Sequence, residues 1–169
     1  MNNIKKELKA YINNNLEKEE KSLFDFFVHE EKCGSSFEGI KLRKSSNIKN
    51  YIDENNQYSD FQTMLFKLID NKKLKDSDVY NKVHIDRRLF SKIRSSKEYH
   101  PSKETIILLA IALELSENEL DELLESASYS LPKNNKYDLI IRFCFINKIF
   151  KIKDINDLLY EYGCKLFSY

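Results

Sequence analysis

Apolar residues recur along much of this chain at the three- and four-residue spacing of an amphipathic helix. Within residues 2–20 the apolar positions are Ile4, Leu8, Tyr11, Ile12 and Leu16. Polar residues occupy the opposite face, so this spacing predicts a helix with one buried side. Residues 22–42 contain an aromatic cluster that fits either a buried strand or the apolar side of a second helix. The polar run at 53–57 places a domain boundary near residue 57.

Beyond this boundary the pattern divides into short helices that begin at polar capping residues. A Ser or Asp side chain at such a position accepts a hydrogen bond from a backbone N–H in the first turn. We expect one helix to begin at Asp76 or Ser77, and others to be capped by Ser59, Asp86, Ser102 and Ser116. Glu119 stands three residues after the last of these caps, which is the capping-box spacing. Two further helical patterns occupy residues 136–150 and 153–163.

The amino-acid composition agrees with an all-α fold class. Only 3 glycines and 2 prolines are present among 169 residues, whereas a sandwich or barrel needs many tight turns. A hydrophobic fraction of 41% is enough to form a real core. We therefore expect a partly helical N-terminal extension over residues 1–57 and a larger helical domain over residues 58–169.

The charge balance restricts how this protein can bind a charged partner. The formal net charge is +1, so no long-range field draws the whole molecule to nucleic acid or to an anionic membrane. Any electrostatic binding must come from a local patch. The three cysteines form no C-x-x-C pair and no secretory signal is visible, which predicts reduced thiols in the cytoplasm. No apolar run reaches membrane-spanning length, so we expect no membrane partner.

One short segment, residues 77–101, concentrates basic side chains although the chain is nearly neutral. A short helix runs into a tight turn and then into a second helix capped by Asp86. The residues expected to be buried between these two helices are Val79, Val83, Ile85, Phe90 and Ile93. The side chains expected to project from the start of the second helix are Arg87, Arg88, Ser91 and Lys92. The DNA major groove, about 12 Å wide, admits one such helix held by a preceding helix packed across it.

Two blocks of this region resemble the phage-repressor-like (XRE-type) helix-turn-helix family. The blocks read LKDSDVYNKVHIDRRLFSKIRS and HPSKETIILLAIALELS, and the resemblance spans Phe61 to about Leu124. It implies a domain whose second motif helix reads the major groove, and a homodimer as one way to span two half-sites. Three positions depart from the family pattern: Asp76 replaces its usual Gln, His84 its usual turn Gly and Tyr80 its usual small residue.

The leading hypothesis from these patterns is non-enzymatic, sequence-specific binding of double-stranded DNA by a regulator of transcription. Its candidate DNA contacts are Arg87, Arg88, Ser91, Lys92, Arg94, Lys97 and His100. Arg87 and Arg88 are expected to matter most, because a bidentate arginine–guanine contact discriminates between bases by about 1–3 kcal/mol. Lys97 and His100 are the expected phosphate contacts. The alternative for this basic face is a solvated surface paired to Glu98 or to the acidic helix after residue 116.

A wider resemblance covers residues 60 to about 166. This region is similar to a helical module at the C-terminal end of varied bacterial stress and phage-defence proteins. The similarity implies an alternative function, that of a protein-interaction or adaptor module that keeps the fold without reading DNA. The anion at Asp76, which would repel a phosphate, supports this alternative.

Other kinds of chemistry have little support in the sequence. The three histidines and three cysteines form no zinc-ligand spacing, and neither a glycine-rich phosphate loop nor a nucleophile elbow is present. We therefore expect no enzymatic activity, no metal and no cofactor. The helix after Ser102 is apolar nearly all round. This predicts that residues 137–166 cover it or, as the alternative, that it forms part of a dimer surface.

Overall fold

The regular secondary structure of this protein is α-helical throughout the described residues, which confirms the predicted fold class. The computed structural model describes residues 2–30, 60–96 and 98–168, with the backbone alone for residues 2 and 19–30. The helices are α1 (Asn2–Glu30), α3 (Phe61–Asn71), α4 (Asp76–Lys82), α5 (Arg87–Ser95), α6 (Lys103–Ala112), α7 (Glu117–Glu125), α8 (Lys136–Ile146) and α9 (Ile152–Glu161).

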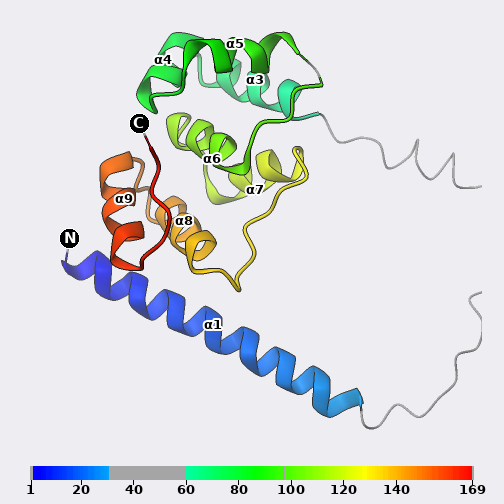
Figure 1. Ribbon diagram of the computed structural model, residues 1–169, viewed down its shortest axis with the longest axis vertical. Helices are drawn as coiled ribbons and strands as arrows, with labels where there is room; N and C mark the ends of the chain where they lie inside the picture. Colours follow the sequence, from blue (N-terminus) through cyan, green and yellow to red (C-terminus); the bar gives the residue numbers. More distant parts are fainter. Residues whose placement is uncertain (1, 31–59, 97, 169) are drawn as a thin grey trace, which may run out of the picture.

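The helices from α3 onward lie in three successive layers (Figure 1). An outer layer contains α3, α4 and α5, a middle layer contains α6 and α7, and α8 and α9 lie below them. The layers are joined where α4 packs on α6, α3 on α7 and α7 on α8. The helix α1 runs along the far side of α8, so the α4–α5 pair and α1 lie at opposite ends of the molecule (Figure 1).

Polar caps define where most of these helices begin. The predicted caps at Asp86, Ser102 and Ser116 are confirmed, the last with a complete capping box that includes Glu119. The helix α4 begins at Asp76, one of the two predicted starts. The predicted cap of α3 at Ser59 is wrong, because Asp60 accepts the hydrogen bond from the Thr63 backbone N–H at 2.7 Å. Ser59 itself lies outside the described residues. Both residue types can cap a helix, so a local pattern leaves such a start uncertain by a residue.

The helix α6 forms the centre of the hydrophobic core. Every residue from Ile106 to Ala112 is buried, in agreement with its nearly uniform apolar sequence. Two ion pairs join its first turn to the C-terminal region predicted to cover it, from Lys103 to the buried carboxylate of Asp138 at 2.7 Å and from Glu104 to Lys165 at 2.6 Å. The helices α4 and α7 also pack on α6. A single chain thus buries α6 from Ile106 to Ala112, so this apolar stretch is not available as a dimer surface.

The N-terminal helix α1 is part of the same packed unit as the C-terminal helices. Leu8 and Ile12 are buried, and the Tyr11 ring lies 5.6 Å from the Phe143 ring of α8. Lys5 forms an ion pair with Glu161 of α9 at 2.8 Å. The amphipathic helix predicted for residues 2–20 is confirmed and continues to residue 30, which assigns the first part of the ambiguous 22–42 region to helix. The remainder of that region lies outside the described residues.

Candidate nucleic-acid interface

The helices α4 and α5 and the tight turn between them share one set of buried side chains. Val79, Val83, Ile85, Phe90 and Ile93 are each at most 8% exposed, as the sequence predicted. The turn is closed by a hydrogen bond from the Ile85 N–H to the Tyr80 carbonyl at 2.9 Å. Together these contacts fix the direction in which α5 leaves the turn.

His84 stands at the position of this turn that needs a left-handed backbone. Its φ is +55°, a conformation that costs most residues free energy because the Cβ crowds the backbone. A glycine at this position would meet no such cost, because it has no Cβ. The turn nevertheless keeps its geometry here, because the flanking Val83 and Ile85 are buried.

The first turn of α5 begins at a cap and presents its cations to solvent. The Asp86 carboxylate accepts a hydrogen bond from the Arg88 backbone N–H at 2.6 Å, so this anion is engaged with the backbone. The side chains of Arg87, Arg88, Ser91 and Lys92 are all exposed. The helix carries four basic residues and no acidic one. Among the described residues, neither Arg87 nor Arg88 takes part in an ion pair, so two guanidinium groups remain available for an external anion.

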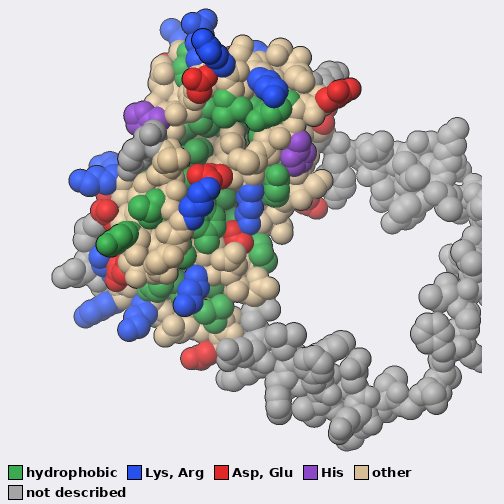
Figure 2. Space-filling model, in the orientation of Figure 1, with side chains coloured by type: hydrophobic (Ala, Val, Ile, Leu, Met, Phe, Trp, Pro, Cys, Tyr) green, Lys and Arg blue, Asp and Glu red, His purple; other side chains and the backbone are tan. Residues whose placement is uncertain are grey.

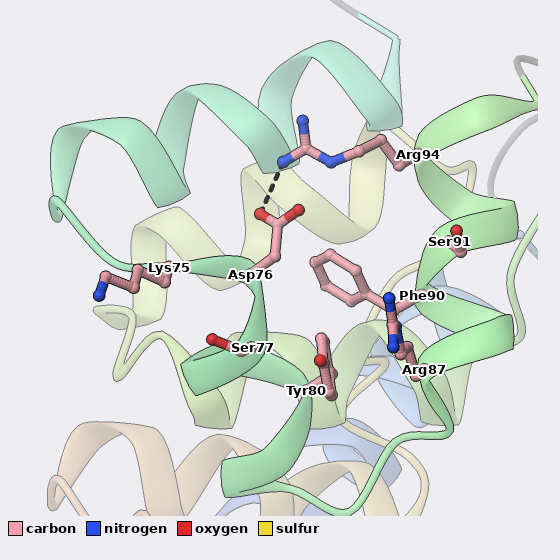
Figure 3. A pocket seen from close by; sticks show the side chains of 8 residues that line it. All are labelled: Lys75, Asp76, Ser77, Tyr80, Arg87, Phe90, Ser91 and Arg94. Atoms are coloured by element: carbon pink, nitrogen blue, oxygen red, sulfur yellow. Dashed lines mark hydrogen bonds and ion pairs between the residues drawn. The ribbon is translucent and has the colours of Figure 1, made fainter.

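A shallow open groove of about 410 Å³ separates the N-terminal part of α4 from α5 (Figure 3). Successive helical residues are turned by about 100°, so Arg87, Ser91 and Arg94 fall on one side of α5. These three face the groove, whereas Arg88 and Lys92 lie further round the helix. The groove wall contributed by α4 and the residue before it consists of Lys75, Asp76, Ser77 and Tyr80.

The Arg94 side chain is engaged by residues of α3 and α4 rather than left free. Its guanidinium forms an ion pair with Asp76 at 2.6 Å across the groove, drawn as the dashed line in Figure 3. The same group lies 4.0 Å from the centre of the Phe66 ring, a cation–π contact. Gln62 donates hydrogen bonds to the carbonyls of Ile93 and Arg94, which fixes the last turn of α5 against α3.

The remaining predicted contacts differ in how free they are. The Lys92 ammonium lies 4.4 Å from the centre of the Tyr99 ring, yet Lys92 stays solvent-exposed. His100 shares a 2.8 Å hydrogen bond with the Ala127 carbonyl, and its ring lies 5.2 Å from the Tyr129 ring. His100 therefore ties its loop to the residues that follow α7. Lys97 lies outside the described residues.

Sequence reasoning missed part of this site, because it considered mainly α5. Lys75, Ser77 and Tyr80 also line the groove, and no local motif marks them as neighbours of α5. The Tyr80 ring lies 5.5 Å from the Phe90 ring, so the bulky residue fills space between the two helices. A helical wheel of α4 would have placed Ser77 and Tyr80 on one face, since they are three residues apart.

Basic side chains are also visible on the molecular surface at this end. In Figure 2 Lys and Arg side chains lie at the upper edge, over the layer of α3, α4 and α5, with Asp or Glu side chains among them. The surface is thus positive in places rather than uniformly. Basic side chains thus gather locally at this end, although the molecule as a whole carries a net charge of only +1.

The described residues offer little for metal, thiol or membrane chemistry. They contain no group of three or more His, Cys, Asp or Glu side chains that could hold a metal ion. Burial raises the pKa of the Cys144 thiol to about 12, so this thiol stays protonated and unreactive in the core. None of the described helices combines the length and apolar character needed to cross a bilayer. Comparison with protein-family models, with curated proteins and with solved structures gives no match to this chain.

Proposed function

We propose that this protein binds double-stranded DNA without catalysing a reaction, as a sequence-specific regulator of transcription. The observation that carries the proposal concerns Arg87 and Arg88 at the start of α5, whose guanidinium groups are exposed and form no ion pair with any residue that the structure describes. They project from a helix whose cap, turn and buried face are all fixed by contacts on the same chain. Such a platform presents cations in one defined geometry.

The dimensions of α5 suit the major groove. An α-helix with its side chains is about 10–12 Å across, which fits a groove about 12 Å wide. The outer layer places α5 at the surface, with α4 packed beside it (Figure 1). In this arrangement Arg87, Arg88 and Ser91 reach base edges, and Lys92 contacts the phosphate backbone. Base contacts supply sequence preference, whereas phosphate contacts supply register and affinity.

Replacing the two arginines tests this proposal. Arg87→Gln with Arg88→Gln is expected to weaken binding to a selected duplex by at least about tenfold, because each bidentate contact discriminates by about 1–3 kcal/mol. The matched control is Lys133→Gln with Lys136→Gln, which removes two exposed cations near the start of α8, far from α5. Fluorescence anisotropy with a labelled duplex measures both variants. Equal losses in the two double variants would contradict the proposal.

A second candidate function, a protein-interaction module of a stress or phage-defence system, is favoured by one observation. The Asp76 carboxylate lies in the groove beside α5, where its negative charge would repel a DNA phosphate. Charge reversal by Arg87→Glu and Arg88→Glu separates the two functions. A DNA-binding protein loses DNA binding in this variant, whereas an adaptor that uses another surface keeps its cellular partner. Partner retention together with no DNA binding by the wild type would favour the adaptor.

A further inference from the structure

The ion pair between Asp76 and Arg94 joins the two helices of the candidate interface across their shared groove. Arg94 lies in the last turn of α5 and lines the same groove as Arg87 and Ser91. Asp76 is the first residue of α4 and faces Arg94 across that groove at 2.6 Å (Figure 3). The Arg94 side chain is 51% exposed and the Asp76 side chain 35% exposed, so this pair lies at the surface that a DNA backbone would approach.

We propose that Asp76 acts as an internal competitor for phosphate, holding Arg94 in a neutral pair and so limiting sequence-independent affinity for DNA. This inference rests on the proposed function and specifies how the same site is regulated. Cations that contact phosphates release condensed counterions from DNA and thereby drive non-specific binding. A guanidinium already paired with a carboxylate releases none, so Arg94 adds no such drive while Asp76 holds it.

The surroundings of Arg94 support this role. The Phe66 ring lies 4.0 Å from the guanidinium carbon and provides a second restraint on the same group. The backbone carbonyl of Arg94 accepts a hydrogen bond from Gln62, so the side chain starts from a fixed point. Arg87, in contrast, lines the groove with no ion pair among the described residues. The groove therefore contains one restrained and one available guanidinium group.

Asp76→Asn tests the inference directly, because it removes the competing charge and keeps the side-chain size. Freeing Arg94 to contact one more phosphate is expected to tighten binding to a mixed-sequence duplex roughly eightfold at about 100 mM salt. The plot of log affinity against log salt is expected to become steeper by about 0.9. Because a phosphate contact does not depend on sequence, the gain should be the same on selected and unselected duplexes.

Asp78→Asn is the matched control within the same turn of α4. It removes the same unit of charge, but Asp78 accepts only a hydrogen bond from the Ser77 hydroxyl at 3.3 Å and forms no ion pair in the described structure. Its effect on affinity is expected to be clearly smaller than that of Asp76→Asn. The double variant Asp76→Asn with Arg94→Gln removes the freed cation, and it should return the salt slope to the wild-type value.

The outcomes separate this inference from the proposed function. A wild type that binds DNA while Asp76→Asn and Asp78→Asn behave alike overturns the competitor role alone. Weaker binding by a folded Asp76→Asn variant also overturns it, because the pair would then be needed to align α4 with α5. Thermal unfolding of each variant establishes that it is folded. Absence of DNA binding in low salt by the wild type and by Asp76→Asn removes both the proposed function and this inference.

Discussion

Five non-glycine residues of the described structure adopt a left-handed backbone, and each follows the end of a helix. They are Lys73, His84, Glu114, Ser128 and Lys148, with φ between 49° and 58°. Beyond each one, the next backbone N–H reaches back to a carbonyl five residues earlier, as in the bond from Leu74 to Ile69 at 3.2 Å. This hydrogen bond, with an apolar residue after the left-handed one, is the Schellman ending. Within the described ranges, Gly163 after α9 is the one residue that uses glycine for this ending.

The left-handed residue after α3 provides a test of this strain. Lys73→Gly is expected to raise the free energy of unfolding by about 0.5 kcal/mol, because relief of the crowded Cβ outweighs the greater freedom of the unfolded chain. The neighbouring Lys72→Gly is the matched control. Lys72 has φ −82°, so the same change there is expected to lower the free energy of unfolding by roughly 1 kcal/mol. Urea denaturation measures both, and a loss of stability in Lys73→Gly as large as in the control would contradict the strain argument.

At the scale of the elements, one arginine joins α7 to α8. Arg142 of α8 donates to Glu117 at 2.6 Å and to Asp121 at 2.8 Å, both on α7, and only 12% of its side chain is exposed. The hydrogen bonds and charges of Asp121 and Glu117 raise the pKa of Arg142 above its usual range, so the guanidinium stays charged. The contact between α7 and α8 in turn joins the middle layer of α6 and α7 to the layer of α8 and α9.

Substitution of Arg142 should show how much this joint contributes. Arg142→Ala is expected to lower the free energy of unfolding by about 2–3 kcal/mol, since it loses both the ion pairs and the packing of the aliphatic stem. Arg142→Met keeps a stem of similar length and is expected to lose roughly 1 kcal/mol less. Its smaller loss also reflects the buried Nε of Arg142, which has no hydrogen-bond partner in the described structure. Chemical denaturation of both variants checks the order, and equal losses would contradict it.

At the scale of the whole molecule, local signals explain most helix positions but few of the contacts between helices. Short stretches of sequence were enough to predict the caps at Asp86, Ser102 and Ser116. The same holds for the nearly uniform apolar surface of α6. The Asp76–Arg94 pair joins residues 18 positions apart, and α1 packs on α8 across more than a hundred residues. No periodicity encodes such a pairing, because it depends on how complete helices meet.

Part of the candidate site followed from the sequence for the same reason. The exposed positions of α5 were predictable, since the buried residues of one short helix fix which others face solvent. The neutralisation of Arg94 and the engagement of His100 with Ala127 were not, because each depends on a partner from another element. A single sequence therefore predicts which side chains are exposed better than which charges remain free.

Salt dependence of DNA binding tests the central claim most directly. Because the net charge is only +1, attraction to DNA must come from local cations. Arg87, Arg88 and Lys92 therefore set the number of counterions that the DNA releases. On a mixed-sequence duplex, where the arginines meet no preferred base, Lys92 alone or together with Arg87 and Arg88 contacts phosphates. The slope of log affinity against log salt is therefore expected to lie between about −0.9 and −2.7. Binding that is undetectable at about 50 mM salt, or a slope near zero, would contradict the account.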